Sequence, residues 1–313
     1  MPHQRRVLVL VGPTASGKSA IGLELALQLN GEILSADSRQ LYRYLDIGTA
    51  KPSPADRLRV PHHFVDERDP DADFDAGEFG VRGRAVIDEI FRRGGTPLVI
   101  GGSGLYVQSL IDGFFEGPGA DPDFREILER RLKSAGVGPL VEELRRIDPD
   151  AASRVDPTKP RRVIRALEVY HVTGIPLSRI QRESKVTIDF EPRMYGLRWD
   201  RKDLYARIER RCDQMIEAGL LAEVDALEKR GYTDRMNSLN TVGYAEVFAY
   251  RRGETSFEEM LRLFKQNSRR YAKRQLTWFR RDSRIQWIAM DESRAAADVA
   301  EQVKRDFTAG MSP

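Results

Sequence analysis

Eight consecutive residues near the N-terminus have the types and the spacing that bind a diphosphate group. The segment 12–19 reads Gly-Pro-Thr-Ala-Ser-Gly-Lys-Ser and fits the phosphate-loop pattern G-x-x-x-x-G-K-[ST]. Its glycines let successive backbone N–H groups point into one concavity, and Lys18 adds a positive charge. The Ser19 hydroxyl suits the Mg²⁺ that accompanies a diphosphate. The expected diphosphate ligands are Gly12, Pro13, Thr14, Ala15, Ser16, Gly17, Lys18 and Ser19, with Mg²⁺ bound at Ser19.

The phosphate loop lies in the sequence context that such a loop requires. Val7–Val11 is a short apolar run rich in β-branched residues, which is typical of a buried parallel strand. Ser19–Leu29 carries apolar residues at helical spacing and ends before Gly31. With glycine at about 7% of residues, a chance match to the motif in such a chain is on the order of one in a hundred. The strand–loop–helix context lowers that figure further, so the motif indicates a real anion site.

The strands that follow do not supply the second magnesium ligand of a kinase or nucleotide hydrolase. Such enzymes normally carry a metal-binding Asp at the end of a second strand. The best buried strand candidate, Pro97–Ile100, is followed by Gly101-Gly102-Ser103, and Phe64–Asp66 is a poor substitute. We therefore expect chemistry on the bearer of a diphosphate, and a small-molecule kinase stays the main alternative enzyme.

Strands and helices alternate over the first third of the chain. Glu32–Ser35 and Pro97–Ile100 have the short apolar pattern of buried strands, like Val7–Val11. Asp75 and Glu78 resemble a capping box that opens a helix, which is expected to stop at Gly94-Gly95. This alternation predicts an α/β fold with a P-loop-type open parallel sheet flanked by helices.

The pattern changes after about residue 116. Helical patterns without intervening strands are expected at Phe124–Ser134, Leu140–Ile147 and Pro160–Val172. The remaining elements are a strand at Arg193–Trp199, helices at Asp200–Ala218, Leu220–Arg230 and Phe257–Arg280, and an edge strand at Ile285–Ile288. We therefore predict a P-loop catalytic core formed by residues 1–116 plus 193–313, interrupted by a helical insertion domain over residues 117–192.

Composition narrows the class of protein. The 313 residues are 41% hydrophobic and 32% charged, as in an ordinary soluble globular protein. The single cysteine, Cys212, excludes an intramolecular disulfide and a Cys-rich zinc module. The longest apolar run near the N-terminus, Val7–Val11, is too short for a signal peptide or a membrane span. We expect a cytoplasmic protein, a monomer without a membrane partner.

Positive charge is concentrated near the C-terminus, although the net charge is only +3. The segment 262–284 contains nine Lys or Arg against one acid, Asp282. A polyanion would respond to this local field. Phe264, Tyr271 and Trp278 recur every seven residues in the same segment, which predicts a buried stripe of rings beside RNA-facing charges.

Several further segments resemble the tRNA dimethylallyltransferase (tRNA isopentenyltransferase) family. They occur in the family's order and span nearly the whole chain. They are Ala36-Asp37-Ser38-Arg39-Gln40-Leu41-Tyr42, Asp46–Pro52, Gly101–Tyr106, Asp121-Pro122, Arg161–Arg165, Thr241–Tyr244 and Lys273–Arg280. Two residues depart from the family pattern: Ser103 stands where Thr is usual, and Ala245 where Arg is common. With one cysteine, the chain also lacks the zinc finger of longer eukaryotic relatives.

The resemblance implies a P-loop-type core with a helical insertion, and a reaction. A dimethylallyl group is transferred with Mg²⁺ from dimethylallyl diphosphate to N6 of the adenosine 3′ of the anticodon in tRNA, releasing diphosphate. Adenine N6 is a poor nucleophile, so a carboxylate that accepts its proton would assist. The expected base is Asp37, which follows a strand close to the phosphate loop. Ser103 is expected to bind the same amine or orient Asp37, and by resemblance Arg125 reaches the mouth of the site.

Contacts with tRNA are also assigned by resemblance. The target base must leave its stack to reach the pocket, with Gln40 and Tyr42 as plausible neighbours. Arg161 and Arg165 lie one helical turn apart and suit phosphate contacts. The full expected set is Asp37, Ser38, Arg39, Gln40, Arg161, Arg162, Val163, Ile164, Arg165, Asn240, Thr241, Val242, Gly243, Tyr244, Ala245, Lys273, Arg274, Gln275 and Arg280.

Two other functions are less favoured. An adenylate isopentenyltransferase, which modifies a free nucleotide, would have little use for Arg161–Arg165 or for the basic segment 262–284. An RNA-binding GTPase-like switch would normally carry a guanine-specificity motif of the N-K-x-D type, which this sequence lacks. Neither alternative accounts for both the clustered basic residues and the carboxylate of Asp37.

Overall fold

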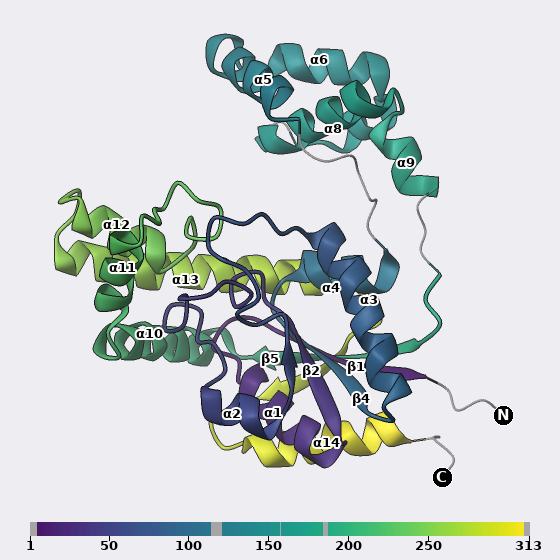
Figure 1. Cartoon of the computed structure of the whole chain (residues 1–313), viewed down its shortest axis with the longest axis vertical. Helices are drawn as coiled ribbons and strands as arrows, with labels where there is room; N and C mark the ends of the chain where they lie inside the picture. The colour runs from purple at the N-terminus through teal and green to yellow at the C-terminus, as the bar shows by residue number, and fades with distance from the viewer. Residues whose placement is uncertain (1–4, 114–120, 157, 184–186, 310–313) are drawn as a thin grey trace. The chain divides into compact units, whose positions relative to one another are not determined.

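The computed structural model describes residues 5–113, 121–156, 158–183 and 187–309 (Figure 1). The chain divides into two compact units. The core comprises Met1–Ile111 and Ile188–Pro313, and the helical unit comprises Asp112–Thr187. The boundaries expected from the sequence, 117 and 192, lie a few residues from these divisions.

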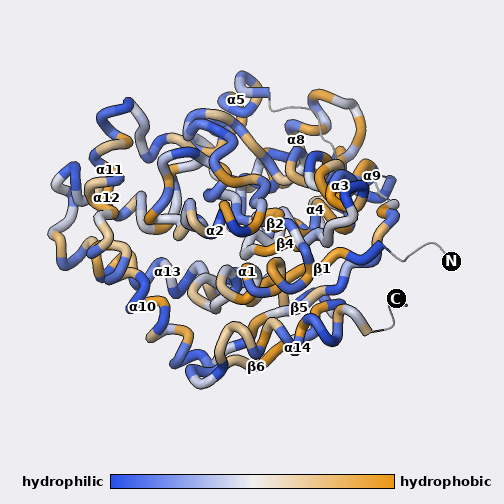
Figure 2. The backbone as a smooth tube through the Cα atoms, turned by 60° about the horizontal axis from the view of Figure 1, so that its bottom comes forward, coloured by the Kyte–Doolittle hydropathy of each residue, from blue (hydrophilic) through white to orange (hydrophobic). Residues whose placement is uncertain are grey.

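The core is built on one sheet of six parallel strands in the order β3-β2-β4-β1-β5-β6. The strands are β1 (Arg6–Val11), β2 (Gly31–Ala36), β3 (His62–His63), β4 (Thr96–Gly101), β5 (Glu191–Trp199) and β6 (Gln286–Met290). All six residues of β1 are buried, and Figure 2 shows this strand as predominantly hydrophobic. Such a continuous apolar run is what a strand covered on both faces requires. The predicted open parallel sheet is confirmed.

Helices from both ends of the chain pack on this sheet. α1 (Lys18–Gln28) contacts β2 and β4 and packs against α14 (Ala296–Thr308), while α3 (Ala76–Arg92) contacts β4. Asp75 caps α3 as predicted, because its carboxylate accepts the Glu78 N–H. The Glu78 side chain pairs with Arg68 instead of completing the capping box. The remaining helices on this side of the chain are α2 (Pro54–Arg59) and α4 (Gly104–Asp112).

The second half of the core is mainly helical. Its helices are α10 (Arg201–Glu217), α11 (Leu220–Lys229), α12 (Tyr244–Arg251) and α13 (Phe257–Phe279). Caps set the starts of the two long ones: Asp200 accepts the Lys202 N–H at α10, and Ser256 accepts the Glu259 N–H at α13. α13 contacts both α10 and α12, so it ties this helical layer together.

The predicted stripe of rings on α13 is only partly correct. Phe264 is buried, but Tyr271 and Trp278 are partly exposed. The buried face instead follows the ordinary helical period through Met260, Phe264, Ser268, Ala272, Gln275 and Phe279. A straight helix drifts by about 20° per seven residues, which moves a strict seven-residue repeat off one face. Tyr271 consequently lines a pocket, described below.

The helical unit has a small hydrophobic core of its own. Its helices are α5 (Pro122–Ala135), α6 (Gly138–Ile147), α7 (Pro149–Arg154), α8 (Pro160–Thr173) and α9 (Leu177–Glu183). Leu128, Leu144 and Val163 are completely buried in this core. Asp121 and Asp148 cap α5 and α7 through backbone N–H groups. The unit therefore carries the elements of an independently packed helical domain.

Candidate active site

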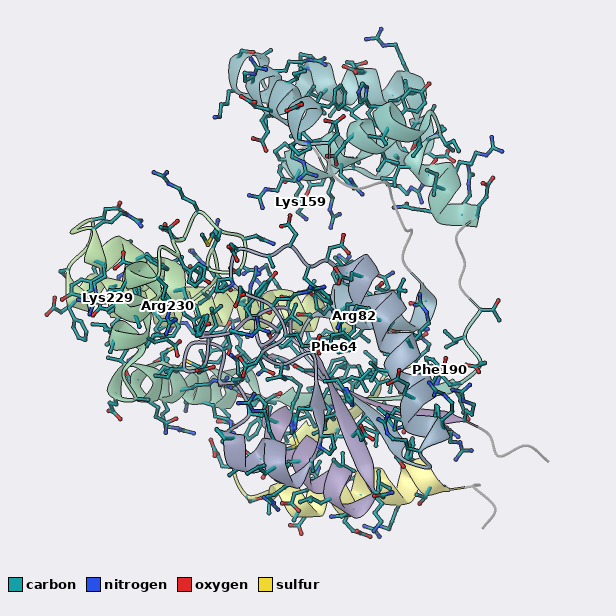
Figure 3. The ribbon with its side chains drawn as sticks, viewed as in Figure 1. Phe64, Arg82, Lys159, Phe190, Lys229 and Arg230 are labelled. Atoms are coloured by element: carbon teal, nitrogen blue, oxygen red, sulfur yellow. The ribbon has the colours of Figure 1, made fainter. Side chains whose placement is uncertain are left out.

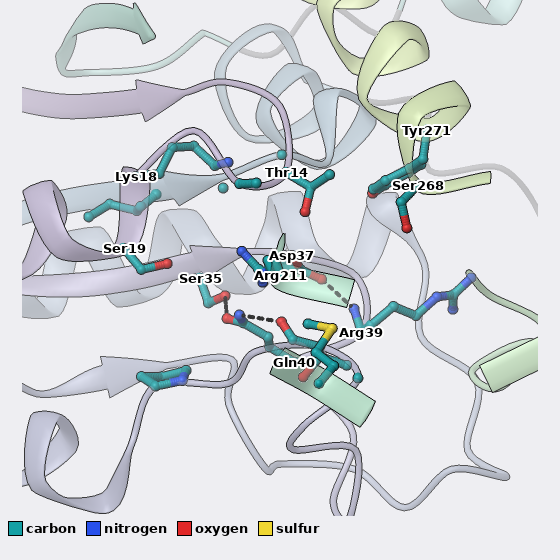
Figure 4. Close-up of a pocket in the computed structure, with 18 of the residues that line it drawn as sticks. Thr14, Lys18, Ser19, Ser35, Asp37, Arg39, Gln40, Arg211, Ser268 and Tyr271 are labelled. Atoms are coloured by element: carbon teal, nitrogen blue, oxygen red, sulfur yellow. Dashed lines mark hydrogen bonds between the residues drawn. The ribbon is translucent and has the colours of Figure 1, made fainter. Parts of the chain in front are cut away.

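A pocket of about 420 Å³ opens where the phosphate loop, the end of β2 and the end of β4 meet (Figure 4). The ends of parallel strands usually supply the ligands in such a sheet. Three groups of residues line it. They are Thr14, Ala15, Lys18 and Ser19 from the loop, Asp37, Arg39, Gln40, Gly101 and Gly102 from the strand ends, and Arg211, Ser268, Tyr271 and Gln275 from α10 and α13.

The phosphate loop leads directly into α1 with no side chain capping that helix. Gly17 occupies the N-cap position in the left-handed region at φ 93°, which favours glycine. Trp199 Nε1 donates to Ser16 O and Arg207 Nε donates to Ala15 O, both at 3.0 Å. A second pocket of about 330 Å³ touches the segment 15–20 and four α10 residues, Arg207, Arg210, Arg211 and Gln214. The loop is thus fixed in place with basic groups facing an open helix N-terminus, which favours an anion.

Lys18 lies in both pockets. Its ammonium donates to Pro13 O at 2.6 Å and approaches Ser16 Oγ at 3.5 Å. Removal from water and, secondarily, the Arg211 charge lower the pKa of Lys18 to about 7, against the opposite pull of Asp37. No ion pair of Lys18 occurs within the described part of the chain. A bound anion would relieve this unfavourable charge.

Arg211 is a site residue that the sequence analysis missed. It lines both pockets, and the described residues give its guanidinium neither a hydrogen bond nor an ion pair. Removal from water lowers its pKa, while the Asp37 charge acts in the opposite direction. Its only sequence signal was the spacing of Arg207 and Arg211 on one helix, which many solvated helices share. The structure makes it a candidate diphosphate ligand.

Asp37 directly follows β2 and lines the same pocket as Lys18. Its Oδ1 accepts the Arg39 N–H at 2.9 Å. Ser103 holds the backbone around it: Ser103 N donates to Ala36 O at 3.0 Å, and Ser103 Oγ accepts the Ser38 N–H at 3.1 Å. Ser103 therefore binds the backbone on both sides of Asp37, while its expected role toward the amine or Asp37 stays a prediction.

The approach of β2 and β4 at this point depends on glycine. Ala36 pairs with Gly101 in the parallel register. A Cβ on Gly101 would lie 2.0 Å from Ala36 O, which no side chain tolerates. The missing side chain keeps the two strand ends close, so Asp37 and Ser103 lie next to each other.

A loop after β2 forms another wall of the pocket, and Gln40 is one of its supports. Gly48 and Thr49 of this loop line the pocket. The Gln40 amide donates to Thr49 O at 3.3 Å and Ala50 O at 3.2 Å, and it accepts from Ser35 Oγ. Gln40 thus lies beside the pocket as expected, with its polar atoms engaged in shaping the wall.

Glu223 of α11 holds the same loop from the other side. Its carboxylate accepts the backbone N–H groups of Asp46, Ile47 and Gly48 at 3.1, 2.8 and 3.2 Å, and the Tyr244 hydroxyl at 2.5 Å. Consecutive N–H groups around one anion form a nest, here occupied by the protein's own carboxylate. Glu223 is a second residue that the sequence analysis missed, because its partners lie far away in the sequence.

Four of the expected tRNA contacts are corrected by burial. Val163 and Ile164 are 0% and 5% exposed in the core of the helical unit. Tyr244 is buried against Glu223, and Gln275 is buried with hydrogen bonds to Thr14 N and Gly102 O. These side chains pack or brace the protein and do not present themselves to RNA. Helical periodicity explains the error at 163 and 164, since they lie on the face opposite Arg161 and Arg162.

The remaining expected contacts include exposed charges. Arg161 and Arg162 are exposed, while Arg165 and Arg125 both bind Glu168, at 2.7 and 2.9 Å. Both arginines belong to the helical unit, so the expected place of Arg125 at the pocket mouth stays a prediction. Elsewhere Thr241 and Val242 line the pocket. Exposed or partly exposed positions in the core are Ser38, Arg39, Asn240, Ala245, Lys273, Arg274 and Arg280, whereas Gly243 is buried.

The basic segment 262–284 divides into paired and unpaired charges. Arg262, Lys265 and Arg269 bind Glu259, Asp213 and Glu209 respectively. Within the described residues Lys273, Arg274 and Arg280 have no ion pair. The unpaired members lie toward the C-terminal end of α13, so the positive field is concentrated there, while ion pairs weaken it at Arg262, Lys265 and Arg269.

Two absences apply to the described residues. No described helix is long and apolar enough to cross a bilayer. Across the same part of the chain, no three His, Cys, Asp or Glu side chains gather as metal ligands.

Comparison with known proteins agrees with this geometry. The IPP transferase family model matches residues 40–282. The tRNA dimethylallyltransferase 1 of Trichlorobacter lovleyi is 46% identical over 93% of this chain and 95% of that protein. The solved tRNA isopentenylpyrophosphate transferase of Bacillus halodurans is 40% identical with a TM-score of 0.70, covering 97% of each chain. A solved eukaryotic dimethylallyltransferase acting on tRNA is 26% identical with a TM-score of 0.83, covering 98% of this chain and 80% of that one. The chain belongs to the IPP transferase family, to which its sequence resemblance pointed.

Proposed function

We propose that this protein transfers a dimethylallyl group from dimethylallyl diphosphate to N6 of the adenosine 3′ of the anticodon in tRNA. One observation carries the proposal: Asp37 and the cations Lys18 and Arg211 line a single pocket. A group that can accept the nucleophile's proton and cations that can bind a diphosphate thus lie in one pocket. The relatives named above, which are tRNA dimethylallyltransferases, support the choice of substrates.

The reaction needs one bond formed, one broken and one proton moved. The N6 lone pair attacks C1 of the dimethylallyl group while the bond between C1 and the diphosphate oxygen breaks. The N6 proton passes to the Asp37 carboxylate, and diphosphate departs with the bonding electrons. General-base assistance of this kind typically contributes 10²–10⁴-fold to the rate.

The leaving group gains charge as that bond breaks, and the surrounding cations stabilise it. Lys18 and the Arg211 guanidinium would lie against the diphosphate at the open N-terminus of α1. Preorganised donors of this type act most strongly where charge develops in the transition state. Because neither cation is ion-paired within the described residues, no competing carboxylate must be displaced first.

Mg²⁺ is the expected cofactor, and the oxygen donors in the pocket suit it. The Ser19 hydroxyl and the Asp37 carboxylate line the same pocket, and Mg²⁺ prefers few protein oxygens plus water and substrate phosphates. When bound, the ion would neutralise diphosphate charge. The chain's own residues would hold the donor, orient the acceptor and accept the proton.

The tRNA would be held by charges outside the pocket. In the helical unit, Arg125, Arg161, Arg162 and Arg165 are candidates, and in the core Lys273, Arg274 and Arg280. Phosphate contacts of this kind position RNA without reading its sequence. We further propose that the protein acts as a monomer in the cytoplasm, where its substrate occurs.

The direct test incubates the protein with radiolabelled dimethylallyl diphosphate, Mg²⁺, and either bulk tRNA or AMP. We expect label in tRNA only, and labelling slower by about 10²–10⁴-fold with the Asp37→Asn variant. Label in AMP alone would identify a free-nucleotide enzyme. ATP hydrolysis at a rate comparable to prenyl transfer would instead support the kinase alternative.

A further inference from the structure

An exposed aromatic stack lies outside the pocket, on the loop that forms its wall. The Tyr44 and Tyr232 rings stack with their centroids 6.3 Å apart and their planes at 25°. The Arg230 guanidinium lies 4.4 Å from the centre of the Tyr44 ring. We propose that this three-residue platform stacks against an unpaired base of the tRNA near the target adenosine, an inference that rests on the function proposed above.

Tyr44 adopts a backbone conformation that disfavours its own side chain. Its φ is 69°, in the left-handed region, where a bulky residue is an outlier and glycine is at ease. Contacts on either side impose the conformation, since Arg43 N donates to Arg68 O at 2.8 Å and Asp46 N donates to Glu223. The fold therefore requires this turn, but it does not require a ring. Such strain persists most often at functional sites.

The ring is also unusually accessible for its type. Tyr44 is 37% exposed, whereas Tyr42, two residues earlier, is 2% exposed. Nucleobases bind proteins by stacking on Tyr rings and on guanidinium planes, and this platform presents both. A paired stem keeps its base faces covered, so the matching partner is an unstacked nucleotide of a loop.

The Arg230 guanidinium is available to a stacked base, although the charges around the platform balance. The guanidinium of Arg230, labelled in Figure 3, has no ion pair or hydrogen bond among the described residues. Nearby surface arginines are paired, Arg251 with Asp225 and Arg252 with Asp234. Removal from water raises the pKa of Tyr232, and the nearby charges of Asp69 and Asp71 raise it further. Arg43 binds Asp69. The charges around the platform therefore balance, Arg230 against Asp71 and Arg43 against Asp69, so stacking should contribute more to binding than phosphate attraction.

The chain geometry keeps the platform close to the pocket. Tyr44 is four residues from Gln40 and four from Gly48, and both of these line the pocket. Four residues span at most about 14 Å. Nucleotides in a strand follow one another at intervals of a few Å, so one near the flipped adenosine can reach Tyr44.

The test exploits the strained backbone. Tyr44→Gly removes the ring and suits the turn, so we expect an unchanged or higher melting temperature together with a roughly 5- to 100-fold weaker affinity for tRNA, the usual effect of losing one base–aromatic stack. The KM for dimethylallyl diphosphate should not change. A lower melting temperature with unchanged tRNA affinity would show that the ring serves only the fold.

A matched control lies elsewhere in the core. Phe257 is 36% exposed and packs against Tyr250, which also carries an arginine, Arg251, over its ring. Phe257→Ala should leave tRNA affinity unchanged, because that arginine is neutralised by Asp225. Equal losses in Phe257→Ala and Tyr44→Gly would overturn the proposal.

An abasic scan identifies the partner and separates this inference from the proposed function. Fluorescence anisotropy with anticodon stem-loops, each lacking one base, should reveal a single position whose loss weakens wild-type binding but not the binding of Tyr44→Gly. A wild type that modifies tRNA while Tyr44→Gly binds every RNA equally well refutes the platform alone. A wild type that neither binds nor modifies tRNA refutes the function.

Discussion

The pocket of the core and the basic face of the helical unit hold positive charge in opposite ways. In the pocket, Lys18 and Arg211 are partly buried without an ion pair in the described chain. In the helical unit, Arg125 and Arg165 share one carboxylate, Glu168, which is 0% exposed. Unpaired charges removed from water are costly until a counterion arrives. Paired charges at the surface are already satisfied.

This difference indicates two kinds of binding. The core keeps a small, costly site that a diphosphate would relieve, so donor binding should depend steeply on each cation. The helical unit orients Arg125 and Arg165 in advance, because the buried Glu168 carboxylate binds both. Burial acts to raise the pKa of Glu168, but its hydrogen bonds with these arginines lower it overall. An RNA phosphate there would bind Arg125 or Arg165 while that arginine is also bound to Glu168. Each such contact should therefore contribute modestly to tRNA affinity.

The largest effect is expected from replacing Asp37, whose carboxylate lines the same pocket as Lys18 and Arg211. Asp37→Asn should lower kcat by 10²–10⁴-fold, because the amide cannot accept the N6 proton. Affinity for tRNA should change little, since the side chain keeps its size. Single-turnover prenyl transfer together with anisotropy measures both quantities. Near-wild-type turnover would place the base elsewhere.

Arg211→Ala should have the next largest effect. Losing a charge-assisted contact to diphosphate should weaken donor binding by about 10- to 100-fold. The neighbouring Arg210 also lines the second pocket, but it is 58% exposed and bound to Glu292, so it is the matched control with a paired charge. Donor KM and inhibition by free diphosphate, measured for both variants, test whether the unpaired cation is the important one. Equal responses would remove the distinction between paired and unpaired charges.

The pH dependence of donor binding follows from Lys18. Its pKa of about 7, below the ordinary 10.5, means that the donor-free enzyme loses this charge as the pH rises through 7. Donor KM should therefore be lowest below pH 7 and rise above it. Lys18→Arg, which stays protonated, should give a flatter profile across pH 6–9. Identical profiles for the two proteins would mean that Lys18 keeps its proton throughout.

The arginines of the helical unit should give the smallest effect. Replacing Arg161 and Arg165 by Ala should reduce the slope of log tRNA affinity against log salt by less than two units, since each lost contact contributes slightly under one. Arg161 is exposed, whereas Arg165 is already ion-paired with Glu168. Most of the change in slope should therefore come from Arg161. Arg130→Ala, which removes another exposed arginine of this unit, is the control. An unchanged slope would make Arg161 and Arg165 an ordinary solvated face.

Local patterns in the sequence did not predict β3 (His62–His63), but they were sufficient to place the other five strands and the segments that carry the phosphate loop and Asp37. Each of these depends on residues that are adjacent in the chain, such as the apolar run of β1 and the motif that follows it. Arg211 and Glu223 were missed because their importance comes from long-range packing. Nothing in the residues around Glu223 indicates that it binds the backbone of Asp46–Gly48.

The errors in the site prediction have the same origin. A motif shared with a family marks a segment, but burial alternates within that segment. Val163 lies in the core of the helical unit, although Arg162 next to it is exposed. Tyr271 was assigned to the core, yet it lines the pocket because the buried face of α13 does not follow a seven-residue repeat.

The pairing of β1 with β5 has a consequence for biosynthesis. β1 leaves the ribosome early, but β5, its neighbour in the sheet, is separated from it by the whole helical unit. Until β5 emerges, one edge of β1 lacks its partner and leaves backbone N–H and C=O groups unpaired beside apolar side chains, which favours aggregation. At about 5–20 residues per second, synthesis from Val11 to Glu191 takes roughly 9–36 seconds. A helical unit with its own hydrophobic core can fold during that time. Its apolar side chains are then buried and do not add a second aggregation-prone surface while the sheet is incomplete.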